Sequence, residues 1–155
     1  MKFFVNLLLI IAAVILQISL VKEFSIYFAV INIILIIMLM LVFANRPIEA
    51  LWWAGLGGIA LDLVSPARFG LFTLSLLVIY YVVNLLIQKV FTDPNIIVVA
   101  TIFFVSSIFV DAAWLFVNPS WQVLLINAIY NTVVGSVFYF LCRDRLRPKE
   151  AIRIS

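Results

Sequence analysis

The stretch AGLGGIALDLVSPARFGLFTLSLLVIYY, residues 54–81, decides the fold of this chain. It holds two apolar runs separated by a short polar segment, in which Ser65 and Pro66 end the first run and Gly70 precedes the second. Apolar runs with such isolated interruptions are typical of membrane helices, because each unpaired backbone group would cost several kcal/mol in hydrocarbon. The stretch therefore predicts two membrane helices joined by a short turn.

The composition of the whole chain extends this prediction to all of its length. Of 155 residues, 67% are hydrophobic and 11% are charged, and the mean hydropathy is +1.30. A bilayer core of about 30 Å needs roughly 20 apolar residues per helical span. We therefore expect an all-α integral membrane protein, a compact bundle of about six transmembrane helices over residues 1–142, followed by a basic cytoplasmic tail over residues 143–155.

Charges, prolines and glycines mark the expected ends of the spans. The six apolar runs are Phe3–Val21, Phe24–Ala44, Ala50–Val64, Leu71–Gln88, Ile96–Val117 and Trp121–Leu141. The third run is short, contains three glycines and is followed by a proline. A re-entrant third run, which would leave five spans, is therefore an open alternative.

The distribution of basic residues predicts the orientation of a six-span chain. With the N-terminus inside, the inner segments hold eight of the ten Lys and Arg residues: Lys2, Arg46, Lys89, Arg143, Arg145, Arg147, Lys149 and Arg153. The outer segments hold the other two, Lys22 and Arg68. By the positive-inside rule both termini are expected in the cytoplasm.

The residue types that usually carry catalysis and metal binding are scarce. The chain has no histidine, and its single cysteine, Cys142, cannot form an internal disulfide. Asp62 and Asp111 are the acidic residues inside spans, and neither lies in a motif of intramembrane aspartyl proteases. We expect no enzymatic activity, no cofactor and no metal site.

Polar and small residues recur at helical spacing within three spans. They are Asn6, Ala13 and Gln17 in the first run; Thr73, Tyr80, Asn84 and Gln88 in the fourth; and Asn127, Asn131 and Gly135 in the sixth. Such stripes are expected where membrane helices meet, because small residues allow close approach and amides hydrogen-bond across. A polar-lined cavity among these three helices is the alternative.

The third run carries the most specific candidate site. Ala54, Gly58 and Asp62 follow one another at four-residue spacing and share one helical face, which we expect to form a groove for a partner helix. A carboxylate in a bilayer is costly, so Asp62 is expected near the outer interface, paired or protonated. Arg68 is its nearest candidate partner, and Asp111 is expected at the same outer end, which predicts a polar network of these three side chains.

Residues 54–81 resemble the pattern of the MreD rod-shape-determining family. The pattern is a glycine-containing helix that ends in Asp-Leu, a short polar turn, Phe-Gly or Leu-Gly, and then a leucine-rich helix. Its specific part here runs from Gly58 through Asp62 to Gly70. Asp62 and Gly70 match the pattern best, Arg68 matches less well, and Asp111 belongs to no motif of the family.

This resemblance implies a non-enzymatic component of the bacterial cell-elongation machinery in the cytoplasmic membrane. It implies association with a bitopic protein of the MreC type and, through it, with MreB filaments, the RodA transglycosylase and a penicillin-binding protein. The expected architecture is also similar to the six-helix substrate-binding components of energy-coupling-factor vitamin transporters. A small-molecule-binding transporter subunit is therefore the alternative function, although the vitamin-contact motifs of those families are missing from the sequence.

Overall fold

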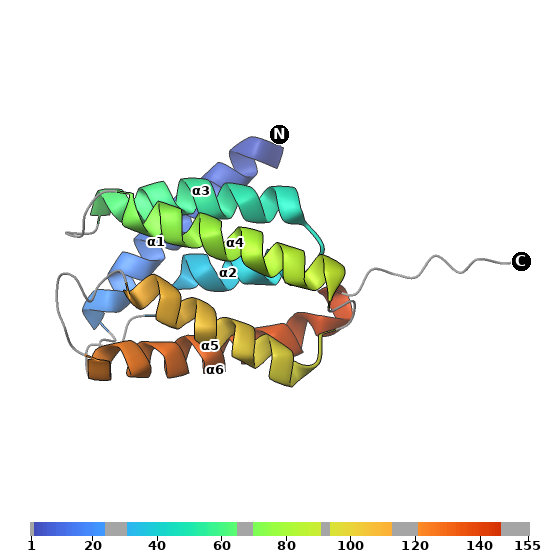
Figure 1. The fold of residues 1–155 in the computed structure, drawn as a ribbon. Helices are drawn as coiled ribbons and strands as arrows, with labels where there is room; N and C mark the ends of the chain where they lie inside the picture. The colour runs from blue at the N-terminus through green and yellow to red at the C-terminus, as the bar shows by residue number, and fades with distance from the viewer. Residues whose placement is uncertain (1, 24–30, 65–69, 91–93, 113–120, 147–155) are drawn as a thin grey trace, which may run out of the picture.

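The protein is an all-helical bundle in the part of the chain that the structure describes. The computed structural model describes residues 2–23, 31–64, 70–90, 94–112 and 121–146. These residues form six helices and no strand (Figure 1): α1 (Lys2–Glu23), α2 (Ile33–Phe43), α3 (Pro47–Val64), α4 (Leu71–Lys89), α5 (Ile96–Ala112) and α6 (Trp121–Leu146). The expectation of an all-α chain with six helices is confirmed.

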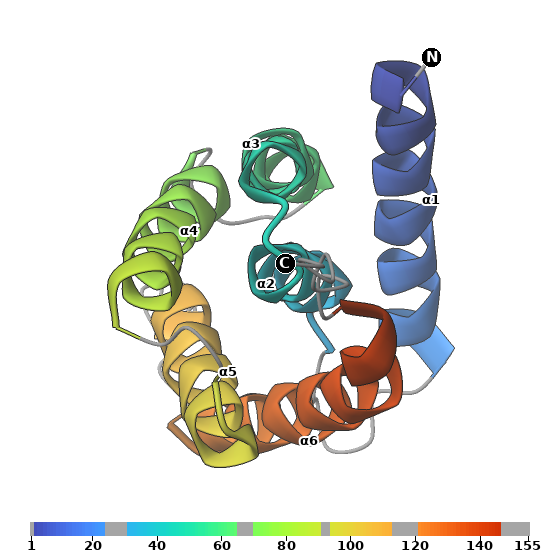
Figure 2. The ribbon, with the colours of Figure 1, turned by 90° about the vertical axis from the view of Figure 1, so that its right-hand side faces the viewer.

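Helix α2 occupies the centre of the bundle. Figure 2 shows α3, α4, α5 and α6 in an arc around it, with α1 on the remaining side. The side chains of Ile34, Leu35, Met38 and Leu39 on α2 are fully buried. A helix that is apolar all round needs neighbours on every side, and this arrangement supplies them.

The outer surface of the bundle is apolar and fits a membrane location. Three helical segments are long and apolar enough to cross a membrane, namely Pro47–Val64, Leu71–Lys89 and Trp121–Cys142. The apolar segments Phe4–Ser19, Ile33–Phe43 and Ile96–Ala112 are shorter. Large side chains such as Leu63, Ile97 and Leu141 point outward and are mostly exposed, which is the arrangement that a lipid solvent favours.

The second apolar run differs from its expected form as one helix over Phe24–Ala44. Helix α2 begins only at Ile33, and Ile31 and Asn32 before it are not helical; residues 24–30 lie outside the described residues. The side chain of Asn32 caps α2 by accepting a hydrogen bond from the backbone N–H of Leu35 at 3.0 Å. Eleven residues rise about 16 Å, so α2 does not cross a bilayer core alone.

The third run, in contrast, forms one unbroken helix of 18 residues. Asn45 ends the preceding turn in the left-handed region, at φ 56°, and Pro47 opens α3. Proline suits the first helical position, where its missing N–H is not needed. The run therefore does not turn back on itself, and the re-entrant form that would have left five spans is not what the structure contains.

Helices α5 and α6 form a hairpin that is closely packed along its length. A Cβ on Gly135 of α6 would lie 2.6 Å from the ring of Phe103 on α5, so the glycine permits this approach. The hairpin meets the central helix through Phe43, whose ring centroid lies 5.9 Å from that of Phe103 and 5.4 Å from that of Tyr139. Helix α6 continues to Leu146, so the first four residues of the expected tail are helical.

Candidate functional site: two buried polar clusters and an apolar groove

Asp62 lies near the end of α3 and binds the first turn of α4. One carboxylate oxygen accepts the backbone N–H of Phe72 at 3.0 Å. The other accepts the backbone N–H of Thr73 at 3.0 Å and its hydroxyl at 2.6 Å. Asp62 is 4% exposed, and three donors of α4 satisfy its carboxylate there. We call this group the Asp62 cap.

The start of α4 explains why this cap comes from another helix. The N-cap residue of α4 is Gly70, at φ 96°, and it has no side chain with which to bind the free N–H groups of the first turn. Asp62 supplies that function from α3. A carboxylate is also favoured at a helix N-terminus by the helix dipole. Arg68, the expected partner of Asp62, lies outside the described residues.

The small-residue face of α3 is covered by the chain's own helices. Ala54 and Gly58 are both buried. A Cβ on Gly58 would lie 2.6 Å from the Cα of Thr73, and one on Gly57 would lie 2.6 Å from the side chain of Ile34. The spacing of these residues predicted close helix contact, and α4 and α2 make it. The groove that was expected here for a partner helix is filled from within.

Asp111 belongs to a second cluster, which joins α5, α6 and the start of α2. The Asp111 carboxylate accepts a hydrogen bond from the Ser107 hydroxyl at 3.3 Å, and it also bonds to the Asn127 side chain. The Asn131 amide donates to the Ser107 hydroxyl at 2.8 Å, and its carbonyl oxygen accepts the backbone N–H of Asn32 at 2.8 Å. We call these five residues the α2 polar network.

The α2 polar network stabilises the point at which the second apolar run breaks. All five of its residues are buried. A buried polar group costs free energy unless it is bonded. The backbone N–H of Asn32 is such a group, and it bonds to the side chain of Asn131, on a distant part of the chain. The network and the Asp62 cap bond to different helices, and none of the hydrogen bonds between described residues joins the two aspartates. Among the described residues the two aspartates thus belong to separate clusters, and the expected network of Asp62, Arg68 and Asp111 stays a prediction, because Arg68 lies outside the described residues.

The polar stripes predicted from spacing have different outcomes. On α6, Asn127, Asn131 and Gly135 are all buried and face other helices. On α4, the half-buried Asn84 and the exposed Gln88 bond to each other at 3.2 Å. The centre between α1, α4 and α6 is occupied by α2 (Figure 2). The α6 positions therefore serve contacts between helices, whereas the α4 pair bonds within its own helix. The alternative of a polar cavity among the three helices is not supported.

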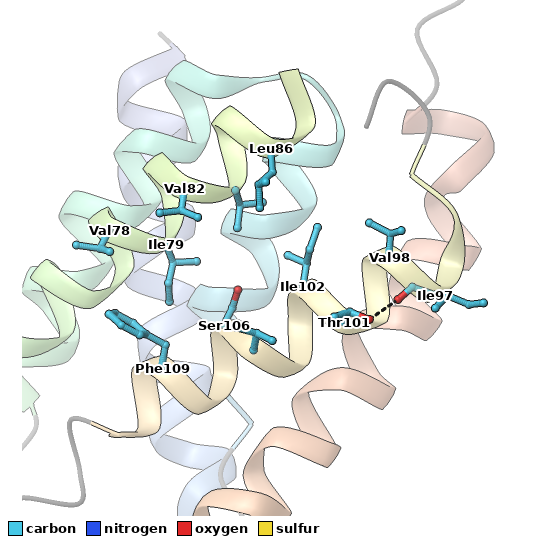
Figure 3. A pocket seen from close by; sticks show the side chains of 12 residues that line it. Val78, Ile79, Val82, Leu86, Ile97, Val98, Thr101, Ile102, Ser106 and Phe109 are labelled. Carbon is cyan, nitrogen blue, oxygen red and sulfur yellow. Dashed lines mark hydrogen bonds between the residues drawn. The ribbon is translucent and has the colours of Figure 1, made fainter. Parts of the chain in front are cut away.

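An apolar groove lies between α4 and α5, with a volume of about 490 Å³. Figure 3 shows the side chains that line it. They are Val78, Ile79, Val82, Val83, Leu86, Ile97, Val98, Thr101, Ile102, Val105, Ser106 and Phe109. Sequence analysis missed this groove, because both faces consist of ordinary apolar residues. The sequence feature that could have indicated the groove is the lack of glycine and alanine on the facing sides of these two helices, because helices without small residues there cannot pack closely.

Chemistry-bearing groups are few in the part of the chain that the structure describes. No three side chains of His, Cys, Asp and Glu gather there in a way that could hold a metal ion. Asp62 and Asp111 are each bonded to helix-forming neighbours, as described above. The arrangement can hold helices together and offers a groove to an apolar helix or chain.

Comparison with known proteins finds no similarity that identifies the chain. No family model matches the sequence, and neither a curated protein nor a solved structure is similar to it.

Proposed function

We propose that the chain is a non-enzymatic scaffold of the bacterial cell-elongation machinery. It is embedded in the cytoplasmic membrane as a six-span bundle with both termini in the cytoplasm. The resemblance of residues 54–81 to the MreD family supplies this identity, and the excess of Lys and Arg on one side supplies the orientation.

One observation carries the scaffold proposal. The buried side chains of Asp62 and Asn131 bond to other helices or to the residues that precede them, so they hold the bundle together. Asp62 illustrates this, because it is one of the two best-matching residues of the MreD-like pattern and the bonds that it makes to described residues go to the start of α4. A rigid bundle with an apolar groove is suited to hold a helix of another protein.

The partner class follows from the same resemblance. The direct partner is a bitopic membrane protein of the MreC type, and MreB, RodA and a penicillin-binding protein associate through it. Because the face at Gly58 is occupied by Thr73, the partner helix binds elsewhere on the bundle than the sequence indicated.

Affinity purification from the native host in a mild detergent tests this function. The tagged chain should recover the MreC-type protein and other elongation proteins, identified by mass. The control is a tagged membrane protein of similar size and abundance from another pathway. Recovery of an ATPase pair with a coupling membrane subunit would contradict the scaffold and favour the alternative, a small-molecule-binding subunit of an energy-coupling-factor transporter.

A further inference from the structure

We infer that the groove between α4 and α5 binds one transmembrane helix of a partner, and that this helix places a hydrogen-bonding side chain against Ser106. The inference rests on the scaffold function proposed above and assigns its binding surface. Three observations carry it: the shape of the groove, the unpaired hydroxyl of Ser106 and the depth at which that hydroxyl lies.

The groove is the place where two neighbouring helices in the arc do not close on each other. Helices α3 and α4 meet at Gly58, and α5 and α6 meet at Gly135, each with a contact that a Cβ would disturb. Helices α4 and α5 face each other instead with branched side chains, such as Val82 and Val105, and leave a volume of about 490 Å³ between them.

Ser106 presents a hydroxyl to this groove without a bonding partner. The residue is only 4% exposed, and Figure 3 shows its oxygen directed into the space between the two helices. None of the hydrogen bonds between described residues involves it. Thr101, five residues earlier on the same wall, instead donates its hydroxyl to the carbonyl oxygen of Ile97 at 2.8 Å. The groove thus contains one polar group that is available to an occupant.

The depth of Ser106 distinguishes a protein helix from a lipid. Ser106 lies ten residues after Ile96 and six before Ala112, about 15 Å and 9 Å along α5. An acyl chain offers nothing but hydrocarbon at such a depth, because the polar groups of lipids lie at the membrane surface. A partner helix can place a Ser, Thr, Asn or Gln side chain there, as membrane helices do where they associate.

The lining of the groove also defines the rest of the partner's contact face. Close packing of membrane helices requires small residues on at least one side. Apart from Ser106 and Thr101, the walls carry only Val, Ile, Leu and Phe side chains. The partner helix therefore presents small residues, Gly or Ala, on either side of its hydrogen-bonding residue.

Photo-crosslinking in the native host tests the surface directly. Benzoylphenylalanine is introduced at Val82 and at Val105, which are 49% and 59% exposed on opposite walls of the groove. Val133 of α6, 56% exposed and outside the groove, is the control position. We expect an adduct with one bitopic protein from both groove positions and not from Val133. Adducts with lipid alone at Val82 and Val105 would overturn the inference.

A pair of hydroxyl variants tests the role of Ser106. In the chain that carries the crosslinker at Val82, Ser106→Ala should lower the adduct yield about threefold, the weight of one interhelical hydrogen bond in a membrane. Thr101→Val should leave the yield unchanged, because the Thr101 hydroxyl is already bonded within its own helix. Equal yields from the two variants would refute the contact with Ser106.

The outcomes separate this inference from the proposed function. If elongation proteins co-purify but crosslink from Val133 and not from the groove, the function stands and the groove inference fails. If the groove positions capture a bitopic protein of another machinery, the groove inference stands and the proposed function fails.

Discussion

Asp62 and Thr73 lie eleven residues apart on neighbouring helices, and the Asp62 carboxylate accepts both the backbone N–H of Thr73, at 3.0 Å, and its hydroxyl, at 2.6 Å. With the third bond from the backbone N–H of Phe72, this carboxylate replaces the side chain that Gly70 lacks at the N-cap of α4. The end of α3 and the start of α4 are thereby held together independently of the residues that connect them.

Asp62→Asn should destabilise the bundle by about 1–3 kcal/mol, the range for a lost helix cap and an unsatisfied buried donor. Asparagine preserves the size of the side chain but offers one acceptor oxygen to three donors. The free energy of unfolding, measured by SDS titration in a fixed mild detergent, is the readout.

Thr73→Val provides the control for this interpretation. It removes one donor to Asp62, so the double variant should lose less stability than the sum of the two single variants. Fully additive losses would mean that Asp62 stabilises the bundle by some route other than its contact with Thr73.

Gly58→Ala should destabilise the bundle by about 1–3 kcal/mol, the usual cost of overpacking. The new Cβ would lie 2.6 Å from the Cα of Thr73. Because that neighbour is backbone, α3 and α4 must separate, and the Asp62 cap lengthens with them. The thermal midpoint of the purified protein in one detergent measures the effect.

Gly55→Ala is the matched control on the same helix. A Cβ on Gly55 meets nothing within 4 Å, so the change should be neutral or stabilising by up to about 1 kcal/mol, since alanine favours helix. Equal losses at Gly55 and Gly58 would contradict the close approach of α3 to α4.

The face of α3 that contains Gly58 shows what sequence spacing could and could not predict. Four-residue spacing of Ala54, Gly58 and Asp62 predicted a closely packed face, and the structure confirms that all three are buried. Spacing does not say what packs against a face, and the neighbour is α4 of the same chain. The cap of α4 by Asp62 was missed for a similar reason. The spacing of residues within one helix does not predict which residues of the next helix lie beside it.

Asn131→Ala should destabilise the bundle by about 1–3 kcal/mol, because it leaves the Asn32 N–H and the Ser107 hydroxyl without their shared partner in a buried site. Asn84→Ala is the control. Among the described residues, Asn84 accepts a side-chain bond from the exposed Gln88 alone, so its loss should stay within about 0.5 kcal/mol. SDS titration of both variants compares them, and similar losses would show that the α2 polar network adds nothing to stability.

The break before α2 marks the limit of local sequence patterns. Residues 24–44 are continuously apolar apart from a few small polar residues, so they predicted one span. Asn32 ends that continuity because its backbone N–H bonds to Asn131, 99 residues away. The third run, with its glycines, looked more interrupted than the second and yet is an unbroken helix. Its glycines permit close packing and do not end the helix.

Cysteine labelling tests the orientation that the basic residues predict. In a Cys142→Ser parent, Lys89→Cys reports the end of α4 and Trp121→Cys reports the start of α6; both positions are exposed. With both termini in the cytoplasm and six spans, a membrane-impermeant maleimide should label Trp121→Cys in intact cells and reach Lys89→Cys only after the membrane is opened. The reverse pattern would place the basic end of the chain outside. Labelling of both positions in intact cells would show that α4, α5 and α6 do not alternate across the membrane, and the six-span topology would be wrong.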